Sequence, residues 1–178
     1  MTRILGSCMV KTFVLVCLLF GFVTAEAEKL KVVTTTTMIY DAVKQIGANR
    51  VQVEGLMGAG VDPHLYKPAA SDVIKLTKAD IVFYNGLALE GKMADLFSRL
   101  QKQGKPVYAV TETISKAKLL KPDGVQGHWD PHVWGDPDLW IECVSLIAEN
   151  LMKADPEGTT AYRQAAQAYT KKLSDLKA

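Results

Sequence analysis

The chain has 178 residues and a nearly balanced charge, with 21 basic and 19 acidic side chains. This balance leaves no excess of positive charge for nucleic acid or an anionic membrane, so neither is expected as a partner. The three cysteines are Cys8, Cys17 and Cys143. If the first 25 residues are removed on export, Cys143 remains alone and no intramolecular disulfide is possible. The fold must then rest on packing.

Residues 1–25 have the features of a signal peptide. Arg3 and Lys11 precede an apolar run, and Ala25 offers a small-residue cleavage point, with Ala27 as the alternative. At about a dozen residues the run is too short to span a bilayer, which needs roughly 20. We therefore expect a periplasmic protein whose remaining 153 residues suit one domain with a proper core.

Apolar patterns between residues 30 and 110 predict alternating strands and helices. Runs of β-branched and apolar residues indicate strands, and apolar residues three and four positions apart indicate helices. The expected strands are 30–36, 51–56, 81–84 and 106–110, with helices that begin at Thr37, at Ser71 and near Met93. This order predicts an α/β fold with a four-stranded, mainly parallel sheet flanked by helices. Ligands are expected in loops at the carboxyl ends of strands.

Two further helices are expected near the end of the chain. Asp136-Pro137 combines a capping residue with proline at the first helical position, and predicts a helix that runs to Lys153. A last helix is expected from about Thr159, with an apolar stripe formed by Tyr162, Ala165, Ala166, Tyr169, Leu173 and Leu176. No glycine or proline closes this pattern. We therefore expect the partner of the stripe to lie in residues outside this chain.

The most informative pattern is Asp-Pro-His, which occurs twice although the chain has only three histidines and seven prolines. His64 follows Asp62-Pro63, and His132 follows Asp130-Pro131. Proline restricts its own φ and favours extended geometry in the residue before it, so each Asp-Pro-His segment forms a conformationally restricted turn, called a corner below. Each aspartate is placed to form the local turn or to accept the second ring N–H of its histidine. The pattern predicts a metal site with both histidines as ligands.

Other residues near this pattern have simpler interpretations. The proline between His128 and His132 breaks the helix that a zinc-binding pair at this spacing would need, so His128 is expected to be a loop residue. Glu90, Asp62 and Asp130 are possible metal ligands, but supporting or turn-forming roles are favoured.

Aromatic and cysteine side chains also need an interpretation. Trp140 and Cys143 lie on the inner side of the helix predicted over 137–153, so both are expected to pack in the core. Trp134, two residues after His132, is expected to shield the metal site. The two histidines themselves have a plainer alternative, because they could be hydrogen-bonded residues of surface loops.

Several motifs occur in order along the chain: Val32-Val33-Thr34-Thr35, residues 60–66, residues 79–82, Asn85-Gly86 with Glu90, and residues 130–134 followed by Asp136-Pro137. In these motifs and their spacing the sequence closely resembles the metal-binding solute receptors of bacterial manganese and zinc ABC importers. This family is also called TroA-like or lipoprotein receptor antigen. The resemblance covers essentially the whole mature chain, and several ordered motifs are far more specific than one.

The resemblance implies two α/β lobes joined by a long rigid helix, with one metal ion in the cleft between them. His64 and His132 would be the first-lobe ligands, and a histidine or glutamate and an aspartate of the second lobe would complete the set. In these terms residues 26–155 form the N-terminal lobe and residues 156–178 begin the interlobe helix. In these terms we expect a truncated receptor that lacks the second lobe and has half a metal site. Gly135 replaces a bulky apolar residue that relatives usually have, and is expected to loosen the turn.

The expected function is capture of Mn²⁺ or Zn²⁺ as a transported ligand and its delivery to a cognate ABC permease in the inner membrane. We expect a monomer without enzymatic activity. The short loop after His64 lacks the histidine-rich tract of many zinc-specific relatives, which favours manganese or mixed use. Two alternatives remain, a surface adhesin and a zinc-dependent hydrolase. The hydrolase would need a third ligand and a general base that no motif supplies.

Overall fold

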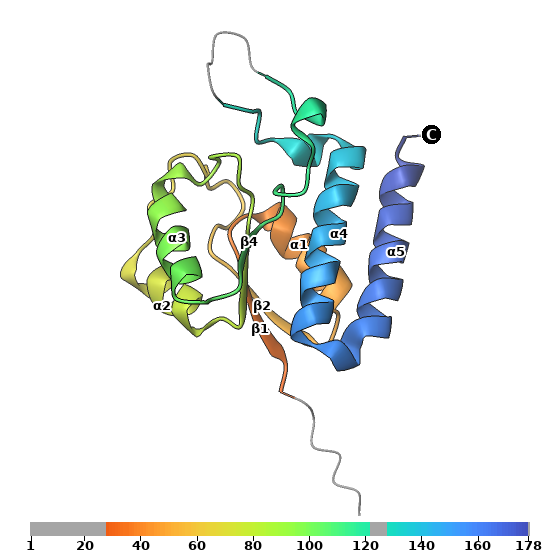
Figure 1. Ribbon diagram of the computed structural model, residues 1–178, viewed down its shortest axis with the longest axis horizontal. Helices are drawn as coiled ribbons and strands as arrows, with labels where there is room; N and C mark the ends of the chain where they lie inside the picture. Colours follow the sequence, from red (N-terminus) through yellow and green to blue (C-terminus); the bar gives the residue numbers. More distant parts are fainter. Residues whose placement is uncertain (1–27, 122–127, 178) are drawn as a thin grey trace, which may run out of the picture.

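The structure is a computed structural model that describes residues 28–121 and 128–177 (Figure 1). The expected signal peptide, residues 1–25 with the alternative cleavage point at residue 27, lies outside the described residues. The elements are β1 (Leu30–Thr34), α1 (Thr37–Gly47), β2 (Val51–Gly55), α2 (Ala70–Lys78), β3 (Ile81–Tyr84), α3 (Ala94–Lys102), β4 (Val107–Ala109), α4 (Pro137–Ala154) and α5 (Thr159–Asp175). No helix in these two described ranges is long and apolar enough to cross a membrane.

The four strands form one sheet in the order β2-β1-β3-β4, and every neighbouring pair is parallel. Figure 1 shows α2 and α3 on one face, and α1, α4 and α5 on the other. Successive side chains of β1 enter opposite layers, because strand side chains alternate between faces. Val32 packs with residues of α1, α4 and α5, whereas Val33 packs with residues of α2 and α3. The predicted α/β sheet is confirmed.

The first strand is shorter than the sequence predicts. A strand was expected through Thr36, but β1 ends at Thr34. The backbone N–H of Thr35 still donates to the carbonyl of Phe83 at 3.2 Å, and Thr36 already precedes the first residue of α1. β-branched residues are compatible with either state, so the pattern alone could not place the boundary. The consequence is that Thr35 lies at the carboxyl edge of the sheet.

The helix predicted from Asp136-Pro137 is confirmed as α4. The Asp136 carboxylate accepts the backbone N–H of Asp138 at 2.8 Å and that of Leu139 at 3.4 Å. These bonds satisfy donors that have no partner within the helix. The cap also fixes where α4 begins, at Pro137, five residues after His132.

The partner of the α5 stripe lies within the chain, which corrects the expectation that it lies outside. Tyr162 is fully buried, and Ala166 is 9% exposed, in the core that α1 and α4 share. The Tyr169 hydroxyl lies 3.2 Å from the carboxylate of Asp41 in α1. Only the end of the stripe is open, since Leu176 is 76% exposed. The apolar faces of α1 and α4 lie next to each other and cover the stripe.

An ion pair connects the turn just before β2 to the turn between α4 and α5. Arg50 donates from Nε and Nη2 to the two oxygens of Asp155, at 2.7 and 2.8 Å. The Tyr162 hydroxyl donates to the same carboxylate at 2.6 Å. The hydrogen bonds from Arg50 are the largest cause that lowers the pKa of Asp155 to about 2. Gly158 leaves room for the network, because a Cβ there would approach Arg50 Nε to 2.5 Å.

We predict that Asp155→Asn lowers the free energy of unfolding by about 2 kcal/mol at neutral pH, because the charge-assisted hydrogen bonds from Arg50 and Tyr162 are weakened. A lowered folded-state pKa stabilises the protein above the ordinary value of 3.8, and this contribution is lost as the pH falls towards about 2. The stabilities of the two proteins should therefore converge between pH 4 and pH 2 in urea titrations.

The matched control is Asp175→Asn, which breaks the exposed pair between Lys171 and Asp175. Its expected loss is below about 0.5 kcal/mol, since solvent screens such pairs. Equal losses in the two variants would contradict a special role for Asp155.

Candidate metal site

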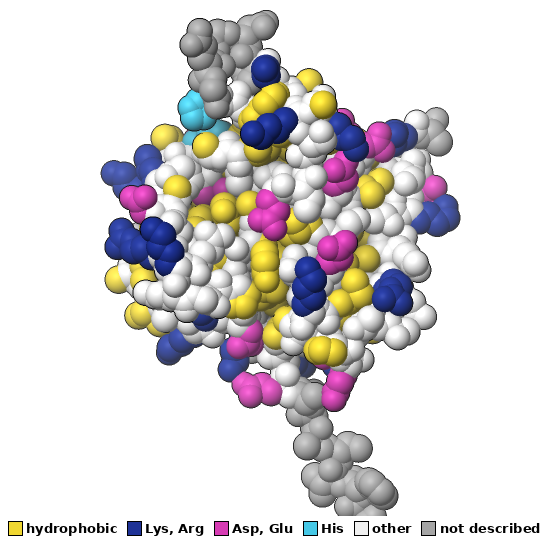
Figure 2. Space-filling view, in the orientation of Figure 1, with side chains coloured by type: hydrophobic (Ala, Val, Ile, Leu, Met, Phe, Trp, Pro, Cys, Tyr) yellow, Lys and Arg dark blue, Asp and Glu magenta, His cyan; other side chains and the backbone are white. Residues whose placement is uncertain are grey.

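The two histidines of the Asp-Pro-His motifs lie side by side at the carboxyl edge of the sheet. Their Nε2 atoms are 3.3 Å apart, and their ring centroids are 5.4 Å apart. His64 lies in the loop between β2 and α2, and His132 lies just before α4. Both residues are exposed to solvent. Histidine side chains appear in cyan at one end of the molecule in Figure 2. The fold thus brings together two rings separated by 68 positions.

Both corners have the same local structure. The Asp62 carboxylate accepts the backbone N–H of His64 at 2.9 Å, and Asp130 accepts that of His132 at 2.9 Å. Such a bond from an aspartate to the residue two positions on closes a tight turn around the intervening proline. The turn-forming role predicted for both aspartates is confirmed.

Asp130 also controls the ring of His132. Its Oδ1 lies 2.6 Å from Nδ1 of that ring, so the neutral imidazole carries its proton on Nδ1. The Nε2 atom, with its lone pair, then faces His64. Hydrogen bonds from the backbone and then from the ring of His132 lower the pKa of Asp130. In the absence of an ion, the 3.3 Å contact is a hydrogen bond if His64 carries its proton on Nε2.

The separation of the two nitrogens suits a shared metal ion. Two bonds of about 2.0–2.1 Å that meet at a tetrahedral angle place their nitrogens about 3.3–3.4 Å apart. The observed distance between the Nε2 atoms is 3.3 Å. Within residues 28–121 and 128–177, however, no three side chains of histidine, cysteine, aspartate or glutamate converge into a metal-binding cluster. His128 is an exposed loop residue and does not complete such a group with the pair.

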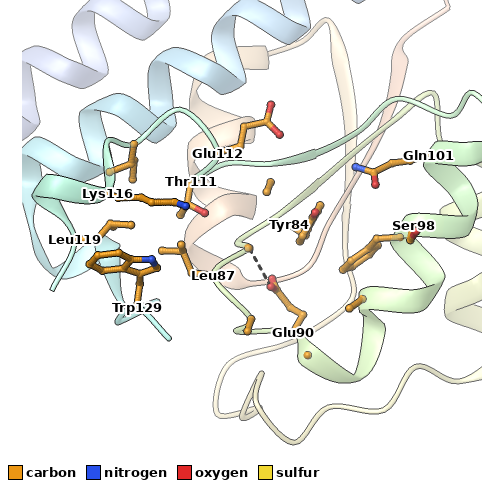
Figure 3. A pocket seen from close by; sticks show the side chains of 17 residues that line it. Tyr84, Leu87, Glu90, Ser98, Gln101, Thr111, Glu112, Lys116, Leu119 and Trp129 are labelled. Carbon is orange, nitrogen blue, oxygen red and sulfur yellow. Dashed lines mark hydrogen bonds between the residues drawn. The ribbon is translucent and has the colours of Figure 1, made fainter. Parts of the chain in front are cut away.

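Glu90 is engaged in the turn after β3 rather than directed at the histidines. It is 3% exposed, and its carboxylate accepts the Thr35 hydroxyl at 2.7 Å and the backbone N–H groups of Asn85 and Gly86 at 2.8 and 3.2 Å. Figure 3 shows the bond to Gly86. Burial raises the pKa of Glu90, and the hydrogen bonds oppose this shift. The favoured turn-forming interpretation of Glu90 therefore agrees with the structure.

A contact that the sequence did not indicate links this turn to the second corner. The side-chain Nδ2 of Asn85 donates to the carbonyl of Pro131 at 3.0 Å, across 46 positions. Asn-Gly was interpreted only as a turn, and no local signal shows where an asparagine amide points. A partner so distant becomes visible only once the fold has placed β3 next to the His132 loop.

The aromatic and cysteine predictions can also be compared with the structure. Trp140 is 4% exposed and Cys143 is fully buried, which confirms both as core residues. Burial raises the pKa of the Cys143 thiol to about 12. Trp134 contacts the His132 ring edge-on, with ring centroids 5.2 Å apart, so it covers one side of that imidazole. A Cβ at Gly135 would meet no atom within 4 Å, so a side chain fits there.

A cavity of about 640 Å³ shares Glu90 with the surroundings of the site, but neither of the two histidines lines it. It is lined by residues of β3, α3 and the segment after β4, together with Trp129, and Glu90 forms part of its wall (Figure 3). His132 lines a separate, smaller cavity of about 260 Å³, and both imidazole-bearing residues are exposed to solvent.

Comparison with known proteins agrees with this geometry. Residues 32–178 match the family described as zinc-uptake complex component A, periplasmic. The chain belongs to this family. The family resemblance inferred from the ordered motifs is thereby confirmed.

Individual relatives of the zinc-uptake component A family extend the comparison. The manganese-binding lipoprotein MntA of Bacillus subtilis is 45% identical over 149 residues, which are 84% of this chain and 48% of MntA. The zinc-binding protein TroA of Treponema pallidum is 46% identical over 160 residues, 89% of this chain and 51% of TroA. The chain spans about half the length of the curated relatives it matches.

Solved structures give the same result. The periplasmic zinc-binding protein TroA from Treponema pallidum superposes with a TM-score of 0.79, over 84% of this chain and 53% of that one, at 46% identity. The manganese-bound periplasmic protein from Candidatus Liberibacter asiaticus gives 0.72 over 82% and 53%, at 28% identity. The described sheet and its helices are therefore a known arrangement of this family.

We predict that Asp130→Ala moves the proton of the neutral His132 ring from Nδ1 towards Nε2, because the carboxylate that holds the Nδ1–H is removed. Ring ¹⁵N chemical shifts, measured at a pH where the ring is neutral, report the tautomer directly. Asp62→Ala is the matched control, since its carboxylate contacts the backbone of His64. A His132 ring that keeps Nδ1–H in Asp130→Ala would refute the assignment.

Proposed function

We propose that this chain is the metal-capturing part of a solute receptor for an ABC importer, and that it binds Mn²⁺ or Zn²⁺ through the Nε2 atoms of His64 and His132. The observation that carries the proposal is the 3.3 Å separation of these atoms. Asp130 supports it by directing the lone pair of His132 into the shared space. Family membership supports it further, because MntA is a manganese-binding and TroA a zinc-binding protein.

The donor set explains why both metals are considered. Neutral imidazole is a ligand for Zn²⁺, and Mn²⁺ prefers additional oxygen donors. Two imidazoles occupy half of a tetrahedral zinc site and a smaller share of a manganese site, so water or further protein groups must supply the rest. The division into a lobe at residues 26–155 and the beginning of an interlobe helix at residues 156–178 stays a prediction.

A receptor explains the arrangement better than an enzyme does. A catalytic zinc site keeps three protein ligands and a general base near an open position. The described residues offer two imidazoles and no third ligand beside them. The relatives reported above are metal-binding proteins rather than enzymes, which supports the receptor further. We propose that the protein acts in the periplasm, as a monomer, and that a membrane permease is its partner.

Calorimetric titration with Zn²⁺ and with Mn²⁺ tests the site. We predict that His64→Ala and His132→Ala each weaken binding by at least about tenfold, or 1.4 kcal/mol, because one of two protein ligands is lost. His128→Ala is the matched control and should bind as wild type does, since His128 is a separate exposed loop residue. Unchanged binding in both ligand variants would overturn the proposed site.

Two further assays separate the receptor from the alternatives. Metal-dependent turnover of a chromogenic ester or peptide, lost in His64→Ala, would favour a hydrolase. Binding to host surface ligands that persists after chelation would favour an adhesin. A receptor should bind the ion without turnover, and its binding should be abolished by chelation.

A further inference from the structure

We propose that Asn85 is a positioning residue for metal capture: its side-chain amide holds the Pro131 carbonyl and thereby fixes the distance between His132 and His64. This inference deepens the proposed function and rests on it. Asn85 touches neither imidazole ring through any hydrogen bond that the structure shows, so it acts through the backbone of the second Asp-Pro-His corner.

The contact lies immediately before the ligand. Nδ2 of Asn85 donates to the carbonyl oxygen of Pro131 at 3.0 Å, and the next group along the chain is the backbone N–H of His132. That N–H is held by Asp130 at 2.9 Å. The peptide between Pro131 and His132 is thus held at both its oxygen and its nitrogen. Asp130 fixes the shape of the corner, and among the described residues Asn85 is the one that connects this peptide to the end of β3.

The orientation of the amide follows from its neighbours. Nδ2 of Asn85 lies near two acceptors, the carbonyls of Pro131 at 3.0 Å and of Gly86 at 3.2 Å. Reversing the amide would bring its oxygen against both carbonyls, so the nitrogen must face them. The buried Oδ1 then has no hydrogen-bond partner among the described residues. An unpaired buried acceptor is unfavourable, and a side chain chosen only for stability would avoid it.

Hydrogen bonds hold the backbone of Asn85 in place, which fixes the origin of its side-chain amide. Its N–H donates to Glu90 at 2.8 Å, and its carbonyl accepts the Thr111 hydroxyl at 2.7 Å. Gly86, with φ of +87°, completes the turn, and a Cβ there would approach the Thr111 hydroxyl to 2.7 Å. Asn85 is itself fully buried. A short side-chain amide on a backbone held in this way can fix the loop that contains Pro131 and His132 relative to the sheet.

The same group of hydrogen bonds extends towards the loop that contains His64. The carboxylate of Glu90 accepts the Thr35 hydroxyl at 2.7 Å, and the carbonyl of Thr35 accepts the backbone N–H of Met57 at 3.0 Å. Met57 begins the loop that leads to His64. One cluster of hydrogen bonds therefore positions both corners, and within it the side-chain amide of Asn85 holds the second corner, the one that contains His132.

The test compares Asn85→Ala and Asn85→Asp with the matched control Thr111→Val. Asn85→Asp keeps the shape of the side chain but removes the donor to Pro131, whereas Thr111→Val removes a buried hydrogen bond to the Asn85 carbonyl and leaves the amide in place. Zn²⁺ affinity is measured by calorimetry at equal folded fraction. We expect both Asn85 variants to bind about tenfold more weakly than Thr111→Val, as is typical when a group that supports a ligand is lost.

A second measurement needs no metal. In wild-type protein the ring protons of His64 and His132 should show a nuclear Overhauser contact, which Thr111→Val keeps and both Asn85 variants lose. A role in stability alone would lower the melting temperature in all three variants without this difference. Binding of Asn85→Ala within twofold of Thr111→Val, or a ring contact of unchanged intensity, would overturn the proposal.

Two controls keep the outcomes separate. If His132→Ala binds Zn²⁺ as wild type does, the proposed function fails, while the ring contact still decides the role of Asn85. If an Asn85 variant does not fold, hydrogen exchange of the side-chain amide of Asn85 in wild-type protein decides instead. Slow exchange supports the held amide, and exchange at the rate of a free side-chain amide overturns it.

Discussion

The carboxyl edge of the sheet depends on one buried carboxylate, that of Glu90. Burying a charged group without partners is costly, so its three hydrogen bonds are a condition of the fold rather than an addition to it. The donors come from the ends of β1 and β3, through Thr35, Asn85 and Gly86. These two strands are neighbours in the centre of the sheet. Glu90 therefore fixes how the loops after β1 and β3 begin, and both histidine corners lie at the same edge of the sheet.

The Asp-Pro-His corners solve a different part of the problem. Within each corner, proline and the aspartate hydrogen bond remove conformations that an unconstrained histidine would sample, so less entropy would be lost in the proposed binding of an ion. Nothing inside a corner, however, sets its distance from the other corner. That distance comes from the sheet register and from contacts such as that between Asn85 and Pro131. Local stiffness and global placement have separate origins here.

The two imidazoles are not equivalent. Asp130 fixes the tautomer of His132, whereas the hydrogen bond from Asp62 reaches the backbone of His64. The His64 ring can therefore donate an Nε2–H hydrogen bond to His132 or, in the proposed metal capture, present a lone pair at the same position. Both rings are exposed to solvent, and in the proposed metal capture two imidazoles alone would hold an ion weakly.

The sequence by itself determined the features that depend on near neighbours along the chain. These are the alternation of strands and helices, the cap at Asp136, the burial of Cys143 and the turns of the two Asp-Pro-His motifs. Each follows from residue spacing or from a hydrogen bond that spans two or three positions. Periodicity and turn chemistry are local, so they can be inferred from sequence.

Only the tertiary structure decided what covers the α5 stripe, which way the Asn85 amide points and how far apart the two rings lie. Tyr162 packs against α1 and α4, although the partner of its apolar stripe was expected to lie outside this chain. The Asn85 amide meets a carbonyl 46 positions away, and His64 meets His132 across 68 positions. Such contacts depend on strand order and register, which no single segment of the chain specifies by itself.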